Sequence, residues 1–355
     1  MPVVKTKDLQ EGDRLAQNIY RENTLILKAG IALTKAMISK LRQMDVPTAV
    51  IMGDEDDEAP DQPEPTTSAG RTAAPADKRT AGLREKFWEN LFETGHEYRY
   101  GLALNEEKDT AWLESLFIKF MSDSTIYRLM EKLRKWDHYA YQHSFDVFVL
   151  GALFAKRLRL NDIEDFALGC LLHDIGKMNI PQSLLNKPGK LTDREYLLMK
   201  QHTIYGYELL KQHDFGEGIA LLARSHHERI DGSGYPDGLR GNELPEHVKI
   251  LSIVDVYSAT TLRRPYREPY GSSFAERIMM HECKRVNDDY FCRFFQMLNI
   301  FPEDIIVELS EGTLAKIVHV NDKVPTRPSL QDIHQSKPID IPLAQRVQIK
   351  QVIKL

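Results

Sequence analysis

Histidine and aspartate side chains that could bind metal recur along one stretch of the sequence. Imidazole and carboxylate together suit borderline metals such as iron, manganese, cobalt or zinc, whereas calcium takes oxygen ligands almost throughout. The residue types and their order therefore predict a binuclear metal hydrolase and leave the identity of the metal open. The candidate ligands, in chain order, are His143, His173, Asp174, His202, His226, His227 and Asp255.

The adjacent His173 and Asp174 follow an apolar helical stretch, Phe166–Leu172, and precede Gly176, which suits a helix C-terminus. Neighbouring side chains diverge by about 100° on a helix, yet both can reach one cavity between helices. We expect Asp174 to bridge two metals and His173 to serve one. Taken alone, the pair is equally well explained by a capping aspartate beside a half-buried histidine.

Flanking residues offer contacts to a phosphate or a base. Lys177 lies three residues beyond the aspartate of the pair and could stabilise phosphate charge. The loop within Ser225–Gly241 has glycines that permit close backbone approach, and its Tyr235 could stack on a base or bond a phosphate. We interpret Glu228 and Arg229 as groups that orient the histidines.

Asp255 interrupts a strongly apolar helical stretch. A buried, unpaired carboxylate is costly, and metal ligation is one way to offset that cost. Arginines follow closely, and Arg264 and Arg267 are candidates for two-pronged phosphate contacts. Arg263 is better explained as part of a solvated basic turn.

Composition bounds the setting of this chemistry. The 355-residue chain carries a net charge of −5, which gives no general attraction to nucleic acid or an anionic membrane. Its three cysteines are too few and scattered for a disulfide framework. The N-terminus lacks a cationic start with an apolar core, and no apolar run approaches the ~18 residues of a membrane helix. We expect a soluble cytoplasmic protein.

Two segments precede the candidate ligands. Residues 1–52 should form a small α+β N-terminal module, with turns at Gly12 and Gly30. Residues 53–80 are acidic and then rich in proline, alanine and threonine, which predicts a flexible linker. The elements expected in the module are strands at Asn18–Tyr20 and Leu25–Leu27 and a helix at Thr34–Met44.

The rest of the chain divides into three parts. Residues 81–134 repeat apolar side chains at helical spacing and should form two amphipathic helices, while residues 305–355 should form a short β-rich extension. Residues 135–304 hold the ligands, and we expect a mainly α fold there. The expected helices are Tyr139–Leu158, Ile163–His173, Asp193–Gln212, Gly216–Glu228, His247–Leu262 and pieces of Ser273–Asn299, and the expected strands are Ile305–Leu309, Ala315–Val320 and Val347–Leu355.

Residues from Tyr139 to about Arg267 resemble an HD-GYP domain, the branch of the HD phosphohydrolases that degrades the bacterial second messenger cyclic di-GMP. The motifs that carry the resemblance are HDIGK, HxxxG at His202–Gly206, HHExxDGxGYPxGLxG and DVYxAxxxxRPYR. The N-terminal module and the C-terminal extension are also similar to segments that flank such domains. The resemblance implies an HD-type helical bundle.

The resemblance further implies metal-dependent hydrolysis of cyclic di-GMP to linear pGpG, with further cleavage to GMP as an option. It makes all seven candidate ligands metal ligands, gives Asp174 and Lys177 catalytic roles, and predicts two divalent ions, iron or manganese, per chain. Lys177, Tyr235, Arg264 and Arg267 would contact the nucleotide. The partners that we expect are cyclic di-GMP and signalling proteins that contact the N-terminal module, with no nucleic-acid polymer and no membrane, and a homodimer is left open.

Two positions depart from the pattern of the family. Tyr139 stands where some members have a glutamate that holds a third metal, so we expect two metals. Ser258 stands where an acid commonly follows the last ligand, which predicts slower catalysis or a reaction that stops at the linear dinucleotide. Two alternatives remain: a non-catalytic cyclic di-GMP receptor, and an HD phosphohydrolase that acts on a nucleoside phosphate or an alarmone.

Overall fold

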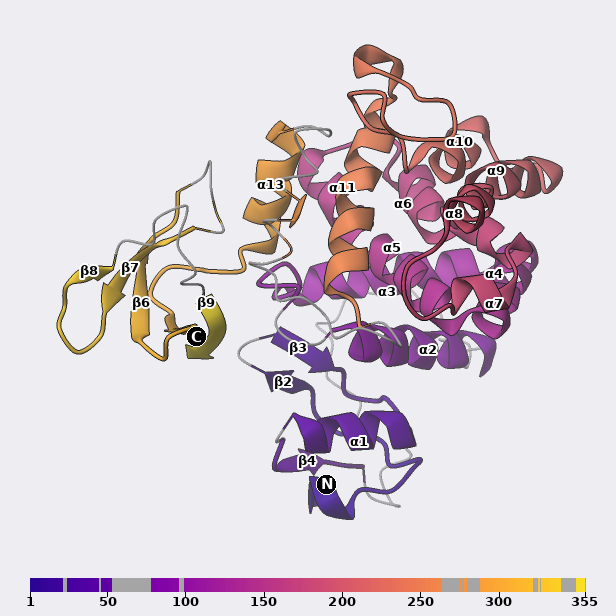
Figure 1. Ribbon diagram of the computed structural model, residues 1–355. Coiled ribbons are helices and arrows are strands. Elements are labelled where there is room, and N and C mark those ends of the chain that lie inside the picture. The colour runs from indigo at the N-terminus through magenta and orange to yellow at the C-terminus, as the bar shows by residue number, and fades with distance from the viewer. Residues whose placement is uncertain are drawn as a thin grey trace, which may run out of the picture.

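The computed structural model describes residues 1–21, 24–44, 46–52, 78–95, 99–263, 275, 278–279, 288–321, 325, 327–339 and 349–354. Within them the fold is mainly α, and along the chain a helical domain follows a small N-terminal unit and precedes a C-terminal sheet. In Figure 1 the N-terminal unit lies below the helical domain and the sheet to its left. Most of the predicted linker, together with Arg264 and Arg267, lies outside the described residues. No described helix is long and apolar enough to cross a membrane.

The N-terminal unit contains two antiparallel strand pairs, one α-helix and one 3-10 turn. One strand pair and the α-helix lie where they were predicted, whereas the other strand pair was not predicted. Its turns use Gly12 and Gly30, whose φ angles of 97° and 85° favour glycine. The side chain of Thr34 caps the helix by accepting from the backbone N–H of Met37. The strands are β1 (Val3–Lys5) paired with β4 (Thr48–Val50) and β2 (Ile19–Arg21) paired with β3 (Thr24–Leu27), and the helices are the 3-10 turn η1 (Thr6–Asp8) and α1 (Lys35–Gln43).

Three helices, rather than the two predicted, precede the ligands: α2 (Lys78–Thr94), α3 (Glu107–Ser122) and α4 (Ser124–Trp136). The first of them begins inside the stretch assigned to the linker. The last two are separate because the carboxylate of Asp123 accepts from the backbone N–H groups of Thr125 and Ile126 and starts a new helix. The apolar periodicity continues through this break, which is why the sequence did not reveal it.

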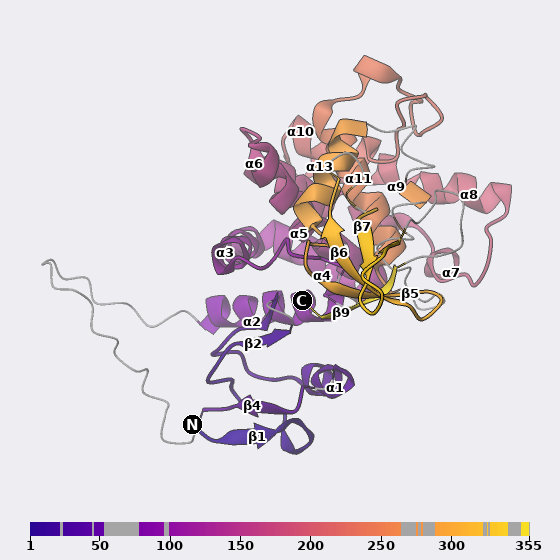
Figure 2. The same cartoon turned by 90° about the vertical axis from the view of Figure 1, so that its left-hand side faces the viewer.

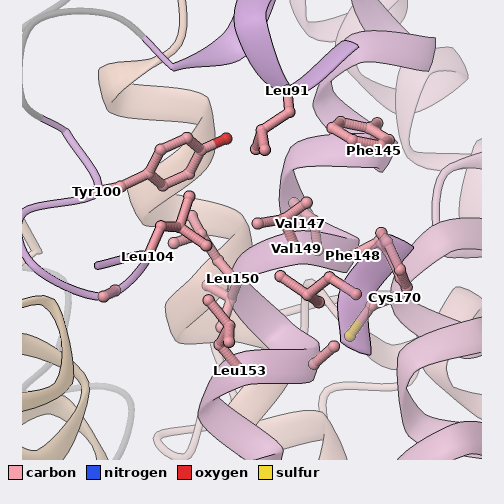
Figure 3. Close-up of a cluster of buried hydrophobic side chains, with 14 of the residues drawn as sticks. Leu91, Tyr100, Leu104, Phe145, Val147, Phe148, Val149, Leu150, Leu153 and Cys170 are labelled. Atoms are coloured by element: carbon pink, nitrogen blue, oxygen red, sulfur yellow. The ribbon is translucent and has the colours of Figure 1, made fainter. Parts of the chain in front are cut away.

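Helix α5 (His138–Leu158) is the centre of the helical domain. From Ser144 to Ala155 every side chain is buried, because α2, α4, α6 (Ile163–Leu172) and α11 (Glu246–Thr261) pack around it. Gly151 permits a close approach to α6, since a Cβ there would lie 2.6 Å from the sulfur of Cys170. Figure 3 shows the resulting cluster, with Leu150 and Phe148 of α5 near Cys170.

Three of the helices that follow α6 carry candidate ligands in them or at their ends. The predicted helix Asp193–Gln212 is broken at Gln201 into α8 (Asp193–Lys200) and α9 (His202–Gln212), so His202 begins a new helix. A Thr192 capping box starts α8. The other elements here are η2 (Ile175–Asn179), α7 (Gln182–Leu185), α10 (Glu217–Ser225), η3 (Gly241–Glu243) and α13 (Asp288–Leu298).

The C-terminal extension is an antiparallel five-stranded sheet with strand order β8-β7-β6-β5-β9, and Figure 2 labels β5, β6, β7 and β9 of this sheet. The three predicted strands are present as β5 (Ile306–Leu309), β6 (Leu314–His319) and β9 (Ile349–Lys354). Two short strands that we did not predict, β7 (Ser329–Asp332) and β8 (Pro338–Ile339), complete it. Their polar and proline-containing sequences lack the β-branched pattern that marks a strand.

Candidate metal centre

The fold brings all seven predicted ligands to one place. Two come from regular helices and five from helix ends, where the chain changes direction and side chains can point inward. Six of the seven are at most 4% exposed, and only the side chain of His227 is more open, at 22%. The contributors are α5 with His143, the end of α6 with His173 and Asp174, the start of α9 with His202, the end of α10 with His226 and His227, and α11 with Asp255.

The ligands form two groups, each with donor atoms within 4.8 Å of one another: His143, His173 and Asp174 in one, and three histidines in the other. Asp174 lies between the groups, because its two oxygens face opposite ways. Oδ2 is 3.5 Å from Nε2 of His173, whereas Oδ1 is 3.4 Å from Nε2 of His202. This arrangement is what a carboxylate that bridges two cations requires.

The two carboxylate oxygens of Asp255 also face different groups of imidazoles. Its Oδ1 lies 2.9 Å from Nε2 of His143 and 3.8 Å from Nε2 of His173, on the side of the first group. Its Oδ2 faces Nδ1 of His227 in the second group, at 3.7 Å. Two carboxylates therefore connect two sets of imidazoles, which is a binuclear pattern.

Hydrogen bonds fix, for three of the five imidazoles, which ring nitrogen is left to bind a metal. Nδ1 of His173, His202 and His226 donates to backbone carbonyls of Cys170, Met199 and Ala223 at 2.8, 2.7 and 3.0 Å. Each ring, when neutral, then has its lone pair on Nε2, which faces the centre. The Nε2 atoms of His202 and His226 are only 3.3 Å apart, and Nε2 of His173 and Oδ1 of Asp174 have no hydrogen-bond partner. Lone pairs that face each other in a buried site fit a cation between them, so the residues fit a divalent metal.

Electrostatics keep these donors, with the exception of His173, in the form that binds metal. Burial lowers the pKa of His202 to about 4 and that of His226 to about 3, so both imidazoles stay neutral. Burial alone would raise the pKa of Asp174, but Lys177 and His173 hold it well below its usual value. Of the five imidazoles, only His173 has a raised pKa, because the attraction of Asp174 outweighs burial. Neutral histidines and anionic aspartates are the states that metal ligation needs.

Two of the four predicted substrate contacts are described, and both border the centre. Nζ of Lys177 donates to Oδ2 of Asp174 at 2.5 Å. The centroid of the Tyr235 ring lies 4.8 Å from that of the His227 ring. Nζ of Lys200 lies 4.9 Å from the same Tyr235 centroid. A small molecule bound at the centre would therefore lie close to both Lys177 and Tyr235.

Sequence reasoning gave Glu228 the wrong partner. Its buried carboxylate accepts from the backbone N–H groups of Asp237, Gly238 and Leu239, at 2.6, 3.0 and 3.0 Å. It holds the loop that carries Tyr235, while three of the histidines are oriented by backbone carbonyls. The carbonyl of Glu228 also accepts from Nη1 of Arg229.

Sequence reasoning singled out Ser258 but missed that it belongs to a buried group behind His143. Asp146 and Ser258 form it together with Arg99, all at most 2% exposed. Asp146 lies three residues beyond His143, one turn along the same helix, and this spacing was the one signal that could have drawn attention to it.

Comparison with known proteins shows that this centre lies in an HD domain. Residues 133–289 match the model of the HD domain. A cyclic di-GMP phosphodiesterase of Pseudomonas aeruginosa is 30% identical over 70% of this chain and 61% of its own. The response regulator RpfG of Xanthomonas campestris pv. campestris, also a cyclic di-GMP phosphodiesterase, is 45% identical over 34% of this chain and 33% of its own. The 3′3′-cGAMP-specific phosphodiesterase 1 of Vibrio cholerae is 40% identical over 43% and 36%. The chain thus spans less than two thirds of each of these relatives.

Proposed function

The chain belongs to the HD-GYP family of HD-domain proteins, and from this premise we propose that residues 135–304 hydrolyse cyclic di-GMP to linear pGpG. The observation that carries the proposal is the pair of carboxylates, Asp174 and Asp255, each of which faces both groups of imidazoles. A phosphodiester is cleaved well by such a centre because charge develops on both the attacking and the leaving oxygen.

We assign two divalent ions, iron or manganese, to the two groups of ligands. When bound, they would supply a water of lowered pKa and offset the phosphate charge. His143 and His173 would hold one ion, and His202, His226 and His227 the other, with Asp174 and Asp255 shared. The mixed nitrogen and oxygen donors favour these metals over calcium or magnesium.

Lys177 is the residue that we expect to act on the phosphate. Its ammonium group points at Asp174, and the pull of that carboxylate outweighs burial and raises the pKa of Lys177. The group therefore stays cationic and can stabilise negative charge that grows on the phosphoryl oxygens. Arg264 and Arg267 lie outside the described residues, and we propose them as further phosphate contacts on the RPYR motif.

Tyr235 is the residue that we expect to contact a base. It belongs to the loop anchored by Glu228, and its ring stands at the more open edge of the centre, beside His227. An aromatic face there can stack on a purine. Stacking distinguishes guanine from adenine poorly, and the likeness to a 3′3′-cGAMP-specific enzyme therefore makes that dinucleotide the second candidate substrate.

The setting of this activity is also part of the proposal. We place the protein in the cytoplasm, where cyclic di-GMP is a signal, and assign contacts with signalling proteins to the N-terminal unit. Product analysis distinguishes cleavage to pGpG from further cleavage to GMP and from a receptor without catalysis. A sedimentation measurement shows whether the protein self-associates.

The test is product chromatography with the full chain purified without oxygen and loaded with Mn²⁺ or Fe²⁺. We expect pGpG from cyclic di-GMP and no product from the Asp174→Ala variant, which should also bind less metal because it lacks the shared carboxylate. Asp165→Ala, an exposed aspartate on α6, is the matched control and should act as the native protein. A metal-loaded native protein that releases neither pGpG nor GMP would contradict the proposal, and linearisation of 3′3′-cGAMP alone would support the second substrate.

A further inference from the structure

A chain of buried side chains leads from Arg99 to the metal ligand His143. Asp146 pairs with Arg99 through two bonds of 2.5 and 2.6 Å, Ser258 donates to Asp146 at 2.5 Å, and Ser258 lies 3.0 Å from Nδ1 of His143. We propose that Ser258 and Asp146 are positioning residues that hold His143 with its Nε2 lone pair directed at the metal. The inference rests on the proposed metal centre and is independent of the substrate.

The direction of each hydrogen bond follows from the surroundings of Asp146. Its Oδ1 accepts from Nη1 of Arg99 and from the hydroxyl of Tyr100, both at 2.5 Å. Its Oδ2 accepts from Nη2 of Arg99 and from the hydroxyl of Ser258. A carboxylate only accepts, so the single proton of Ser258 is committed to Asp146.

The oxygen of Ser258 can therefore only accept from His143. This requires the proton of the neutral imidazole to be on Nδ1, which leaves the lone pair on Nε2. Nε2 lies 2.9 Å from Oδ1 of Asp255, which is also an acceptor. Two acceptors held this close in a buried site repel each other, and a cation bound to both atoms would remove the repulsion, which is the role we give to the first of the two proposed ions.

His143 needs this support because it lies inside a regular helix. His173, His202 and His226 lie at helix ends, and their Nδ1 atoms reach backbone carbonyls. Inside α5 the carbonyls are taken up by the helix itself, so Nδ1 of His143 must find a side chain on α11. Ser258 is that side chain.

The same geometry gives Ser258 a role in the metal centre, where its sequence position alone had predicted slower catalysis. An acid there would hold the histidine directly, and its replacement suggested a weakened centre. Instead, the serine connects the histidine to Asp146, so a carboxylate still supports the ligand through one hydroxyl. Arg99 in turn neutralises that carboxylate and is held by Thr261 of α11 at 2.8 Å.

The test is a Mn²⁺ binding isotherm, measured on the full chain by the magnetic resonance signal of free Mn²⁺. Ser258→Ala should weaken binding at one of two sites by about 10- to 100-fold, the usual effect of removing a partner of a metal-bound histidine. Ser258→Thr keeps the hydroxyl and should retain the native affinity. Ser252→Ala is the control on the same helix, because Ser252 is equally buried but donates to the backbone carbonyl of Lys249.

Catalysis gives a second readout that a general loss of structure would not produce. The kcat of Ser258→Ala should fall at limiting Mn²⁺ and recover at high Mn²⁺, with the KM for cyclic di-GMP unchanged. The inference is overturned if folded Ser258→Ala binds Mn²⁺ as the native protein does, or if folded Ser258→Thr binds as weakly as Ser258→Ala. If no variant hydrolyses cyclic di-GMP but Ser258→Ala still loses Mn²⁺, the proposed function fails and this inference stands.

Discussion

At the scale of single residues, the side chains around the centre divide into those that hold ligands and those that hold the loop. Three of the four histidines at helix ends, His173, His202 and His226, are oriented by backbone carbonyls, so their orientation depends on where the helices end. Glu228 instead gathers three backbone N–H groups of the loop that carries Tyr235. A change at Glu228 should therefore act on substrate binding more than on metal binding.

Glu228→Gln should raise the KM for cyclic di-GMP more than it lowers kcat, with unchanged Mn²⁺ affinity. A glutamine offers only one acceptor oxygen, so at least one of the three N–H groups loses its partner, which lowers the free energy of unfolding by about 1–3 kcal/mol. Steady-state kinetics and thermal unfolding measure both effects. Glu243→Gln is the control, since that exposed carboxylate accepts from the backbone N–H of Arg240. Weaker Mn²⁺ binding with an unchanged KM would instead mean that Glu228 orients the histidines.

The clustering of the seven candidate ligands could be predicted from sequence, because each is a residue type that binds metal and stands in a recognisable local pattern. The support behind His143 could not be predicted. Ser258 is 115 residues away from it, and serine inside an apolar helix usually serves only packing or the backbone. Glu228 was misassigned for a related reason, because its partners are backbone groups that leave no trace in residue types.

At the scale of elements, the centre depends on how closely η2 approaches α9. Gly176 of η2 faces the start of α9, and a Cβ on it would lie 1.9 Å from the carbonyl oxygen of His202 and 2.4 Å from the backbone nitrogen of Gly206. From sequence, Gly176 suits a helix C-terminus. The contact shows another reason for a glycine at this position. Without a Cβ, the backbone of η2, which carries Lys177, can pack directly against the backbone of α9, which carries His202.

Gly176→Ala should lower the free energy of unfolding by at least about 1–3 kcal/mol, because the packed backbones must move apart. The same shift moves His202 away from Asp174, so Mn²⁺ affinity should fall as well. Chemical denaturation and the Mn²⁺ isotherm test the two effects. Gly218→Ala in α10 has no atom within 4 Å of its added Cβ and should cost nothing. Native stability and native Mn²⁺ affinity in Gly176→Ala would show that η2 can shift freely.

Helices were predicted where apolar residues recur at helical spacing, and their existence is confirmed for α5, α6, α10 and α11. Their ends were harder to place. The break at Gln201 between α8 and α9 has no glycine or proline, and its effect is to place His202 at a helix start. Such breaks are set by tertiary packing, which local sequence does not encode.

At the scale of the whole molecule, the N-terminal unit contacts the helical domain close to the groups that support His143. Nζ of Lys40 in α1 donates to the carbonyl oxygens of Phe92 and, at 3.1 Å, Glu93, at the C-terminal end of α2. The side chain of Glu93 accepts from Gln142, the neighbour of His143, at 2.6 Å. Lys40 is therefore the residue through which we expect the two units to be most strongly coupled.

The contact should make stability depend on pH in a way that identifies Lys40. Burial lowers the pKa of Lys40 from 10.5 to about 8. Between these values the unfolded chain binds a proton that the folded chain has released, so the stability of the folded state rises with pH. Relative to Lys40→Met, which cannot titrate, the free energy of unfolding of the native protein should increase by roughly 1–3 kcal/mol between pH 8 and 10.5. Chemical denaturation across this range measures the difference, and Ser39→Ala, an exposed change on α1, should leave the profile unaltered. A difference that stays constant with pH would mean that the Lys40 ammonium is not buried against α2.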